Sequence, residues 1–271
     1  MNITITGTTA STVSPEWVKA SMDLAKFLEA VCPPCMDTGE QILCDGIKSI
    51  QSMDGFTIVV HQSAPAIYNF KWIAKDSVIR SGRDAKYRNV RIALPYVILL
   101  ATFQDGLLTM DNECYFRTSP LNKIDDGLLY PALLNVSKFP NTSNNRALTW
   151  ICTQHLNFGK VHEGPELTRF RDSVAALWQC LIGAGFNYSS EANEGASWYG
   201  ESCKVDKRIA TIEDWQDATR EDPLFAIDVP WLDTGHSLKK MCQRIFKRNV
   251  ADAGPMTAER LATAIFNAKP Q

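Results

Sequence analysis

The sequence predicts an α+β protein in which an antiparallel β-meander is backed by helices. Short β-rich runs separated by turn pairs fill the first half of the chain, whereas apolar residues at helical spacing dominate the second half. No long Gly/Ser-, Pro- or charge-rich linker divides the 271 residues. We therefore expect one elaborated domain over 1–271, with a core over about 14–190 and a helical C-terminal addition over 191–271.

An amphipathic helix is expected near the N-terminus. Ser14-Pro15-Glu16 supplies an N-cap, a proline at the first helical position and an acid in the first turn. Apolar residues then recur on one helical face at Trp17, Leu24, Leu28 and Val31. The pattern predicts a helix from Ser14 to Val31 that ends before Pro33-Pro34.

Three β-rich runs follow, at 41–50, 56–60 and 66–73, with turn pairs such as Asp54-Gly55 between them. They predict the antiparallel meander. The strand pattern resumes over 89–103, where Pro95 demands an edge, a bulge or a break because proline cannot donate to the ladder.

Two further β signals close the first half of the chain. Gln104-Asp105-Gly106 predicts a hairpin turn, and Cys114-Tyr115-Phe116 predicts another strand.

The remaining sequence predicts helices. One begins at Gly164-Pro165-Glu166 and ends at Gly183 or Gly185, with the apolar spacing 3-4-3-1-3. Thr211 and Asp214 predict a capped helix through Thr219. A helix capped by Ser237 and a last helix over 257–266 follow. In the Ser237 helix we expect the apolar side chains to be buried and the basic ones to face solvent, namely Lys239, Lys240, Arg244, Lys247 and Arg248.

Composition and charge limit the possible partners. The chain is 45% hydrophobic and 21% charged, with 28 basic and 30 acidic residues, so its formal net charge is −2. These values are typical of a globular protein and give no global field toward nucleic acid or an anionic membrane. The longest apolar run, 92–103, contains Pro95 and is too short for a membrane-spanning helix. We expect neither a nucleic-acid nor a membrane partner.

The cysteines suggest a reducing compartment. Eight cysteines in 271 residues would be a sparse disulfide framework, and the first residues lack the basic and apolar regions of a signal peptide. We expect free thiols in the cytoplasm.

Cys32-Pro33-Pro34-Cys35 has the spacing of a redox pair or of half a zinc site. The predicted helix precedes the pair, whereas a thioredoxin-type pair opens a helix. Cys44 and His61 are the nearest further metal-ligand candidates. We interpret the pair as structural cysteines at a helix end in preference to a metal site, and we expect no cofactor. The sequence lacks Gly-x-Gly-x-x-Gly, Walker A, His-Glu-x-x-His and Gly-x-Ser-x-Gly motifs, which removes the usual support for nucleotide hydrolysis, zincin and α/β-hydrolase chemistry.

Cys152 is the candidate nucleophile. A catalytic cysteine needs access, a route to the thiolate and donors for an oxyanion. His155 and His162 are candidate bases or orienting groups, and the side-chain amide of Asn135 is a candidate donor. Alternatively, Trp150-Ile151-Cys152 is a strand with its thiol packed inside. A cysteine hydrolase built from Cys152 and either histidine is a further hypothesis.

The order of these features resembles the ubiquitin-conjugating enzyme family. That family has an N-terminal helix, a four-stranded meander, a segment with tyrosine and proline leading to a His-Pro-Asn turn, and then the thioester cysteine and helices. Here Tyr130-Pro131, Asn135 and Ile151-Cys152 stand in that order. The resemblance implies that Cys152 accepts the C-terminal glycyl group of a ubiquitin-like protein as a thioester and passes it to an amine.

Within that superfamily the chain is most similar to the bacterial family D proteins, also called PRTRC system protein B, through Leu94-Pro95-Tyr96, Gly185-Phe186-Asn187 and Trp215. This resemblance implies a plasmid or other mobile element that also encodes a ubiquitin-like modifier and a ThiF-like activating enzyme. The sequence departs from the family where Leu133-Leu134 replaces His-Pro and where an insert over 137–147 lengthens the connection to Cys152. A non-catalytic interaction module with the same fold is therefore the alternative.

Overall fold

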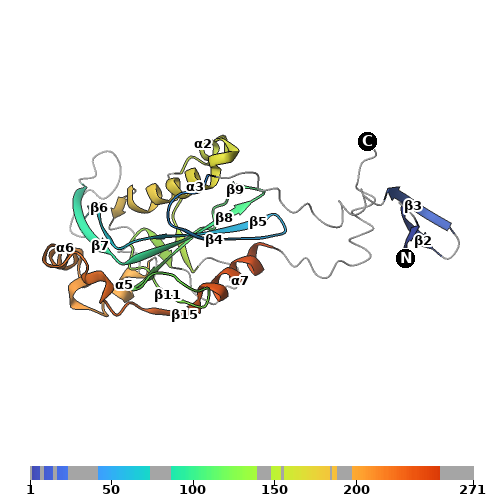
Figure 1. Cartoon of the computed structure of the whole chain (residues 1–271). Coiled ribbons are helices and arrows are strands. Elements are labelled where there is room, and N and C mark those ends of the chain that lie inside the picture. Colours follow the sequence, from blue (N-terminus) through green and yellow to red (C-terminus); the bar gives the residue numbers. More distant parts are fainter. Residues whose placement is uncertain are drawn as a thin grey trace. The chain divides into compact units, whose positions relative to one another are not determined.

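The computed structural model describes residues 2–6, 9–14, 17–23, 42–73, 87–138, 148–153, 156–183, 185–187 and 197–250. Internal contacts divide the chain into two compact units, one formed by 1–39 with 250–271 and the other by 40–249. Figure 1 labels the helices and strands of both units. The predicted helix over 257–266 lies outside the described residues.

The first unit contains a three-stranded antiparallel sheet of β1 (Asn2–Thr6), β2 (Thr9–Ser14) and β3 (Trp17–Asp23). The helix predicted from Ser14 to Val31 is therefore wrong over 17–23, because that segment pairs with β2 from Ser14↔Trp17 to Thr9↔Asp23. A neighbouring strand edge supplies hydrogen bonds that the helical pattern did not take into account, and such tertiary pairing overrides local propensity.

The second unit is built on a nine-stranded sheet with the strand order β12-β13-β10-β8-β5-β4, to which β9, β11 and β15 add. A smaller sheet has the order β14-β6-β7. The strands are β4 (Ile47–Met53), β5 (Phe56–Ser63), β6 (Ala66–Ile73), β7 (Arg88–Leu94), β8 (Tyr96–Gln104), β9 (Leu107–Leu108), β10 (Glu113–Arg117), β11 (Gly127–Leu129), β12 (Val136–Lys138), β13 (Thr149–Ile151), β14 (Gly185–Asn187) and β15 (Asp233–Ser237).

Two predicted hairpin turns are confirmed. Asp54-Gly55 joins β4 to β5, and Asp105-Gly106 joins β8 to β9. The φ angles are positive at all four residues, at 49° and 77° in the first turn and 51° and 76° in the second. Asp-Gly suits such turns because glycine tolerates positive φ and aspartate adopts it more readily than most residues. The predicted strand at Cys114-Tyr115-Phe116 is confirmed as the centre of β10.

A pair of prolines interrupts one long antiparallel ribbon. The register runs from Phe56↔Gln104 to Ser63↔Val97 between β5 and β8, and from Ala66↔Leu94 to Trp72↔Arg88 between β6 and β7. The same register continues across the gap, so Pro65 falls opposite Pro95. Neither proline has an N–H to donate, and the ladder breaks there. The break predicted at Pro95 is thus confirmed, and its cause includes the second proline.

The predicted meander is only partly correct. The strands that neighbour one another in the main sheet are β4, β5, β8 and β10, all antiparallel. The run at 66–73 instead forms β6 of the smaller sheet, where β7 lies on one side and β14 pairs in parallel on the other. The proline break explains the difference, because it lets one ribbon contribute to two sheets.

Helices lie on both faces of the main sheet. The helical elements are α2 (Phe158–His162), η1 (Glu166–Thr168), α3 (Arg169–Trp178), the π-helical turn η2 (Gln179–Gly183), α5 (Tyr199–Ser202), η3 (Lys207–Ile209), α6 (Ile212–Glu221), η4 (Phe225–Ile227) and α7 (Leu238–Asn249). Figure 1 shows α2 and α3 on one side of the sheet and α7 on the other.

Strand β5 illustrates this layering. Val59 belongs to the same buried cluster as Phe170, Val174 and Leu177 of α3, whereas the ring of Phe56 lies 5.8 Å from that of Phe246 on α7. Successive side chains of a strand point to opposite faces, so odd positions of β5 face α3 and even positions face α7. Residues 56–62 are all buried as a result.

The helices predicted from Pro165, from Thr211 and from Ser237 are confirmed in position. The segment predicted from Pro165 is a 3-10 turn, then α3, then η2. In α6 the hydroxyl of Thr211 accepts from the backbone N–H of Asp214, and the Asp214 carboxylate accepts from the N–H of Thr211. This arrangement is the capping box that the sequence predicts.

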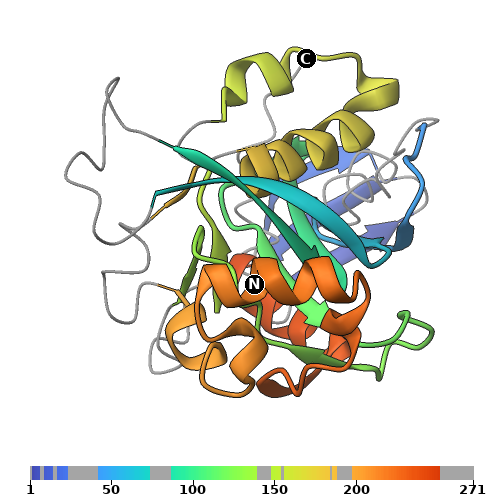
Figure 2. The same cartoon turned by 90° about the vertical axis from the view of Figure 1, so that its left-hand side faces the viewer.

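Helix α6 also closes an edge of the smaller sheet. The Trp215 indole donates to the carbonyl of Ala93 at 2.9 Å, and the N–H of Ala93 donates to the Thr219 hydroxyl at 2.9 Å. Figure 2 shows α6 (orange) beside the β6–β7 ribbon. An unpaired strand edge can associate with another chain. Here Trp215 and Thr219 form hydrogen bonds with the backbone groups of β7 that do not pair with β6.

Helix α7 differs from its prediction. Its apolar side chains Leu238, Met241, Cys242 and Ile245 are buried as expected. Arg244 and Arg248, however, turn inward and pair with the buried carboxylate of Glu113 on β10. Arg248 reaches Glu113 at 3.0 Å, and the Tyr115 hydroxyl donates to the same carboxylate. The prediction that both arginines face solvent is wrong, because a buried acid holds them.

Residues 197–249 belong to the second unit, and β15 in this segment pairs with β11 of the main sheet. The mixed α+β class with an antiparallel sheet is confirmed. Among the described helices, none has the length and apolar character needed to cross a membrane.

Candidate functional site

A short hairpin brings the two principal candidate residues together. Strands β12 and β13 pair from Val136↔Ile151 to Lys138↔Thr149. Asn135 directly precedes β12 and Cys152 directly follows β13, so the two residues flank the pair Val136↔Ile151. The long connection between the two residues is therefore the hairpin itself, and its length does not separate them.

Cys152 is the first residue after β13 and its side chain is partly exposed. Strand β13 is anchored on β10 through Glu113↔Trp150, through a bond from the N–H of Ile151 to the Asn112 carbonyl, and through a bond from the N–H of Cys114 to the Thr149 hydroxyl. The thiol thus stands at the end of a strand that is fixed to the sheet. Cys152 is thus less buried than Cys114 or Cys180.

Asn135 has a structural partner. Its side-chain amide donates to the carbonyl of Leu181 at 2.5 Å and approaches the carbonyl of Cys180 at 3.5 Å. Both carbonyls belong to η2, where the last turn of a helix leaves carbonyls without helical donors. The amide therefore ties the hairpin to the end of α3. Its N–H groups are directed at these carbonyls, so stabilising an oxyanion at Cys152 would require the amide to turn.

Cys180 lies near this tie. Its side chain is 6% exposed, and burial raises the pKa of its thiol, with a smaller contribution from the neighbouring Cys152. The sequence interpretation passed over Cys180 because it lies off the apolar face that runs through Leu177 and Leu181. Its position next to a π-helical turn could not be anticipated from spacing.

The histidine candidates fare differently. The His162 ring packs against Phe158 with centroids 5.6 Å apart, and its Nε2 lies 2.9 Å from the carbonyl of Leu108. This contact fixes α2 to β9. Among the described residues, no hydrogen bond joins His162 to Cys152, and His155 lies outside the described residues. The described geometry therefore supplies no base for a cysteine hydrolase.

The structure describes two of the four metal-ligand candidates, Cys44 and His61. Cys32 and Cys35 lie outside the described residues. Cys44 is partly buried, and burial raises the pKa of its thiol. The His61 ring is occupied at both nitrogens, because the Trp178 indole donates to Nδ1 at 3.2 Å and Nε2 lies 3.0 Å from the Asp45 carbonyl. Within the described ranges, no three His, Cys, Asp or Glu side chains gather as a metal site would require.

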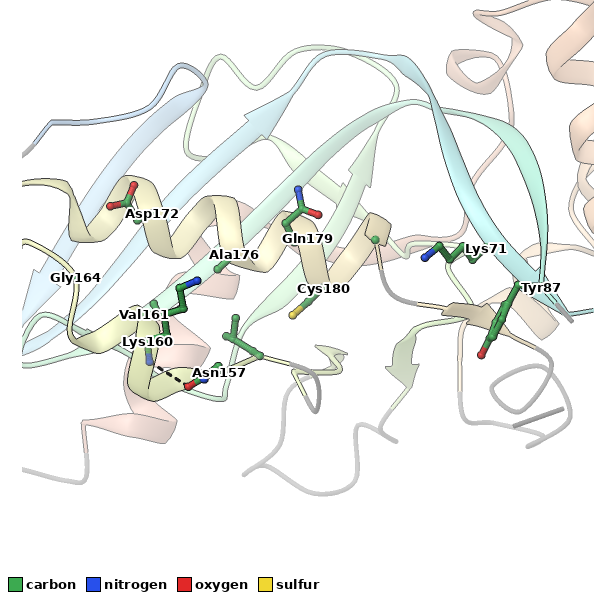
Figure 3. Close-up of a pocket in the computed structure, with 12 residues that line it drawn as sticks. Lys71, Tyr87, Asn157, Lys160, Val161, Gly164, Asp172, Ala176, Gln179 and Cys180 are labelled. Carbon is green, nitrogen blue, oxygen red and sulfur yellow. Dashed lines mark hydrogen bonds between the residues drawn. The ribbon is translucent and has the colours of Figure 1, made fainter. Parts of the chain in front are cut away.

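A cleft of about 760 Å³ opens beside α3, and Cys180 lies in its wall. Figure 3 shows α3 and η2 along one side, with Lys160 and Val161 of α2 and Asn157 below them and Lys71 and Tyr87 at one end. Cys152 is not among the lining residues. The volume is typical of small-molecule sites, which are mostly apolar with a few placed polar groups. The sequence interpretation missed this cleft because its walls come from segments far apart in the chain.

Comparison with protein-family models, with curated proteins and with solved structures finds no match to this chain.

Proposed function

We propose that this chain is a carrier of the ubiquitin-conjugating type, with Cys152 as its acceptor. The observation that carries the proposal is the β12–β13 hairpin, in which Asn135 directly precedes β12 and a partly exposed Cys152 directly follows β13, next to the pair Val136↔Ile151. Two features of the fold support it. The strands β4, β5, β8 and β10 form a four-stranded antiparallel array, and the Tyr130-Pro131 segment, Cys152 and a sheet-covering helix follow in order.

The chemistry is a pair of acyl transfers. The Cys152 thiolate attacks the carbonyl of the modifier's C-terminal glycine, which arrives as a thioester of the activating enzyme. A new thioester forms on Cys152 and the activating-enzyme thiol leaves. An amine then attacks the same carbonyl, an amide forms and the Cys152 thiol is released. ATP is consumed only at the activating enzyme, so the carrier needs no nucleotide site.

Asn135 acts in this proposal as a positioning residue. Its bond to the Leu181 carbonyl holds the hairpin, and hence Cys152, against the end of α3. The proposed partners are a ubiquitin-like modifier and a ThiF-like activating enzyme of a bacterial mobile-element system.

The test uses a ubiquitin-like modifier whose C-terminal glycine is supplied as a small-molecule thioester. We expect the chain to form an adduct that migrates on a non-reducing gel and disappears with reductant. Cys152→Ser should abolish the reductant-sensitive adduct. Cys203→Ser is the matched control, because Cys203 is also a partly exposed cysteine but lies on the short segment after α5. An undiminished reductant-sensitive adduct in Cys152→Ser would overturn the proposal.

A second candidate is a non-catalytic interaction module with the same sheet. The engagement of the Asn135 amide by two backbone carbonyls favours it, because the amide then has a fold-holding task. The module predicts binding of the modifier without an adduct, measured by calorimetry, and equal affinity for the wild type and Cys152→Ser.

A further inference from the structure

The cleft beside α3 has an unbalanced charge. Lys71 and Lys160 line it, and neither forms an ion pair with another residue of the described segments. Its acid, Asp172, is already engaged by the Thr168 hydroxyl at 2.6 Å and by Arg171 at 3.0 Å. A ligand that complements the cleft therefore carries negative charge.

The middle of the cleft is apolar. Leu156, Val161, Ala176 and Cys180 contribute to its walls. The thiol of Cys180 adds to this character, since burial raises its pKa and keeps it protonated. Figure 3 shows Cys180 pointing into the space between η2 and the segment that carries Asn157. An apolar body of a ligand would gain free energy there through the hydrophobic effect.

Lys71 and Tyr87 lie together at one end of the cleft. Lys71 belongs to β6 and Tyr87 directly precedes β7, and both residues line the cleft. An ammonium group and a phenol hydroxyl at one end of a cleft are two donors suited to one carboxylate. Tyr87 is 41% exposed, so an entering ligand can reach it.

We propose that this cleft binds a small amphipathic carboxylate. The carboxylate is held by Lys71 and Tyr87, and the apolar body lies along Ala176 and Cys180. Cys152 is not among the residues that line the cleft, and the inference does not depend on the carrier function.

Octanoate, 1-octanol and octylammonium are matched probes, because they share a chain and differ in the head group. In calorimetric titrations of the full chain we expect octanoate to bind most tightly and octylammonium least tightly. Lengthening the carboxylate should tighten Kd by about three- to fourfold for each added methylene. Equal affinity for the three probes, tighter octylammonium binding or the absence of saturable octanoate binding would each overturn the proposal.

Variants locate the head group. Lys71→Ala should weaken octanoate by about tenfold and leave octanol unchanged, because a hydrogen bond to a charged group is lost. Lys71→Arg should largely restore octanoate binding. Lys240→Ala is the control, since this exposed lysine lies on α7 at the opposite face of the main sheet. Loss of affinity for both probes in Lys71→Ala, or for neither, would contradict the assignment.

The body of the ligand is located through Cys180. Bound octanoate should slow alkylation of Cys180 by N-ethylmaleimide, read by peptide mass spectrometry, without slowing alkylation of Cys203. Ala176→Trp should fill the cleft and abolish binding, whereas Ala176→Ser should retain it. Cys152→Ser should bind octanoate as the wild type does, which separates this inference from the fate of the carrier proposal. Unprotected Cys180 at saturating octanoate would show that the ligand lies elsewhere.

Discussion

Two regions of the second unit each contain two basic side chains. The two regions differ in whether those side chains form ion pairs with an acid of the protein. On the α7 side of the sheet, Arg244 and Arg248 meet the fully buried Glu113. In the cleft beside α3, neither Lys71 nor Lys160 forms an ion pair with a described residue. Asp172 lines the same cleft but is bound by the Thr168 hydroxyl. The first pair is satisfied internally and serves the fold. The second pair is exposed to solvent, and we propose that Lys71 binds the carboxylate of a ligand.

The largest expected effect concerns the satisfied pair. Glu113→Gln keeps the side-chain shape but removes the charge that compensates two buried arginines. We expect a loss of about 3–5 kcal/mol in the free energy of unfolding, because breaking a buried ion pair leaves uncompensated charge. Urea denaturation followed by circular dichroism measures it. A loss below about 1 kcal/mol would show that the arginines reach solvent and that the two regions do not differ as described.

A smaller effect is expected at the tie between hairpin and helix. Asn135→Ala leaves the carbonyl of Leu181 without its donor, which should cost about 1–3 kcal/mol. Asn122→Ala at an exposed position is the matched control. If the carrier proposal holds, Asn135→Ala protein that remains folded should also form the adduct at Cys152 more slowly than the wild type. An unchanged denaturation midpoint would mean that the amide does not hold η2.

His61 provides a third case, a base that the fold keeps neutral. Burial lowers its pKa below the ordinary value of 6.5, with the carbonyl of Asp45 acting weakly in the opposite direction. Below pH 6.5 the unfolded chain therefore binds a proton more readily than the folded chain. Stability should fall as the pH drops through that value and should be constant above it, as far as His61 contributes.

The measurement is the urea midpoint between about pH 5 and 8 for the wild type and His61→Gln. We expect the wild type to show the steeper loss of stability on acidification. Parallel profiles would show that His61 does not differ between the folded and unfolded states.

The smallest effect is expected at an exposed ion pair. Arg220 and Asp217 of α6 lie 2.8 Å apart with side chains 66% and 61% exposed. Asp217→Asn should change the free energy of unfolding by no more than about 0.5 kcal/mol, because solvent screens such pairs. It is also the control for Glu113→Gln. If Asp217→Asn lowered the free energy of unfolding as much as Glu113→Gln does, buried and exposed ion pairs would not differ in their contribution to stability.

Local signals in the sequence predicted several of the elements. Asp54-Gly55 and Asp105-Gly106 specify their turns, and Thr211 with Asp214 specifies the start of α6, because in each case a few neighbouring residues decide the conformation. The apolar spacing around Phe170 and Val174 predicted α3 for the same reason.

Features that depend on distant residues were missed. A helical pattern cannot reveal that Arg244 pairs with Glu113, which lies 131 residues earlier. It cannot reveal that β2 offers an edge to 17–23. The distance in sequence from Asn135 to Cys152 counted against a shared site until the β12–β13 register accounted for it. The cysteine and the asparagine were identified from sequence, but the partners of the asparagine were not.

The opposed prolines, Pro65 and Pro95, have a further consequence for how the chain finds its alignment. A one-residue slip in a hairpin exchanges its two faces, and here a slip would move β5 against β8 and β6 against β7 at once. An error in one sheet would therefore be an error in both. One register therefore fixes the strand alignment in both the main sheet and the smaller sheet, although the backbone hydrogen bonds are interrupted between them.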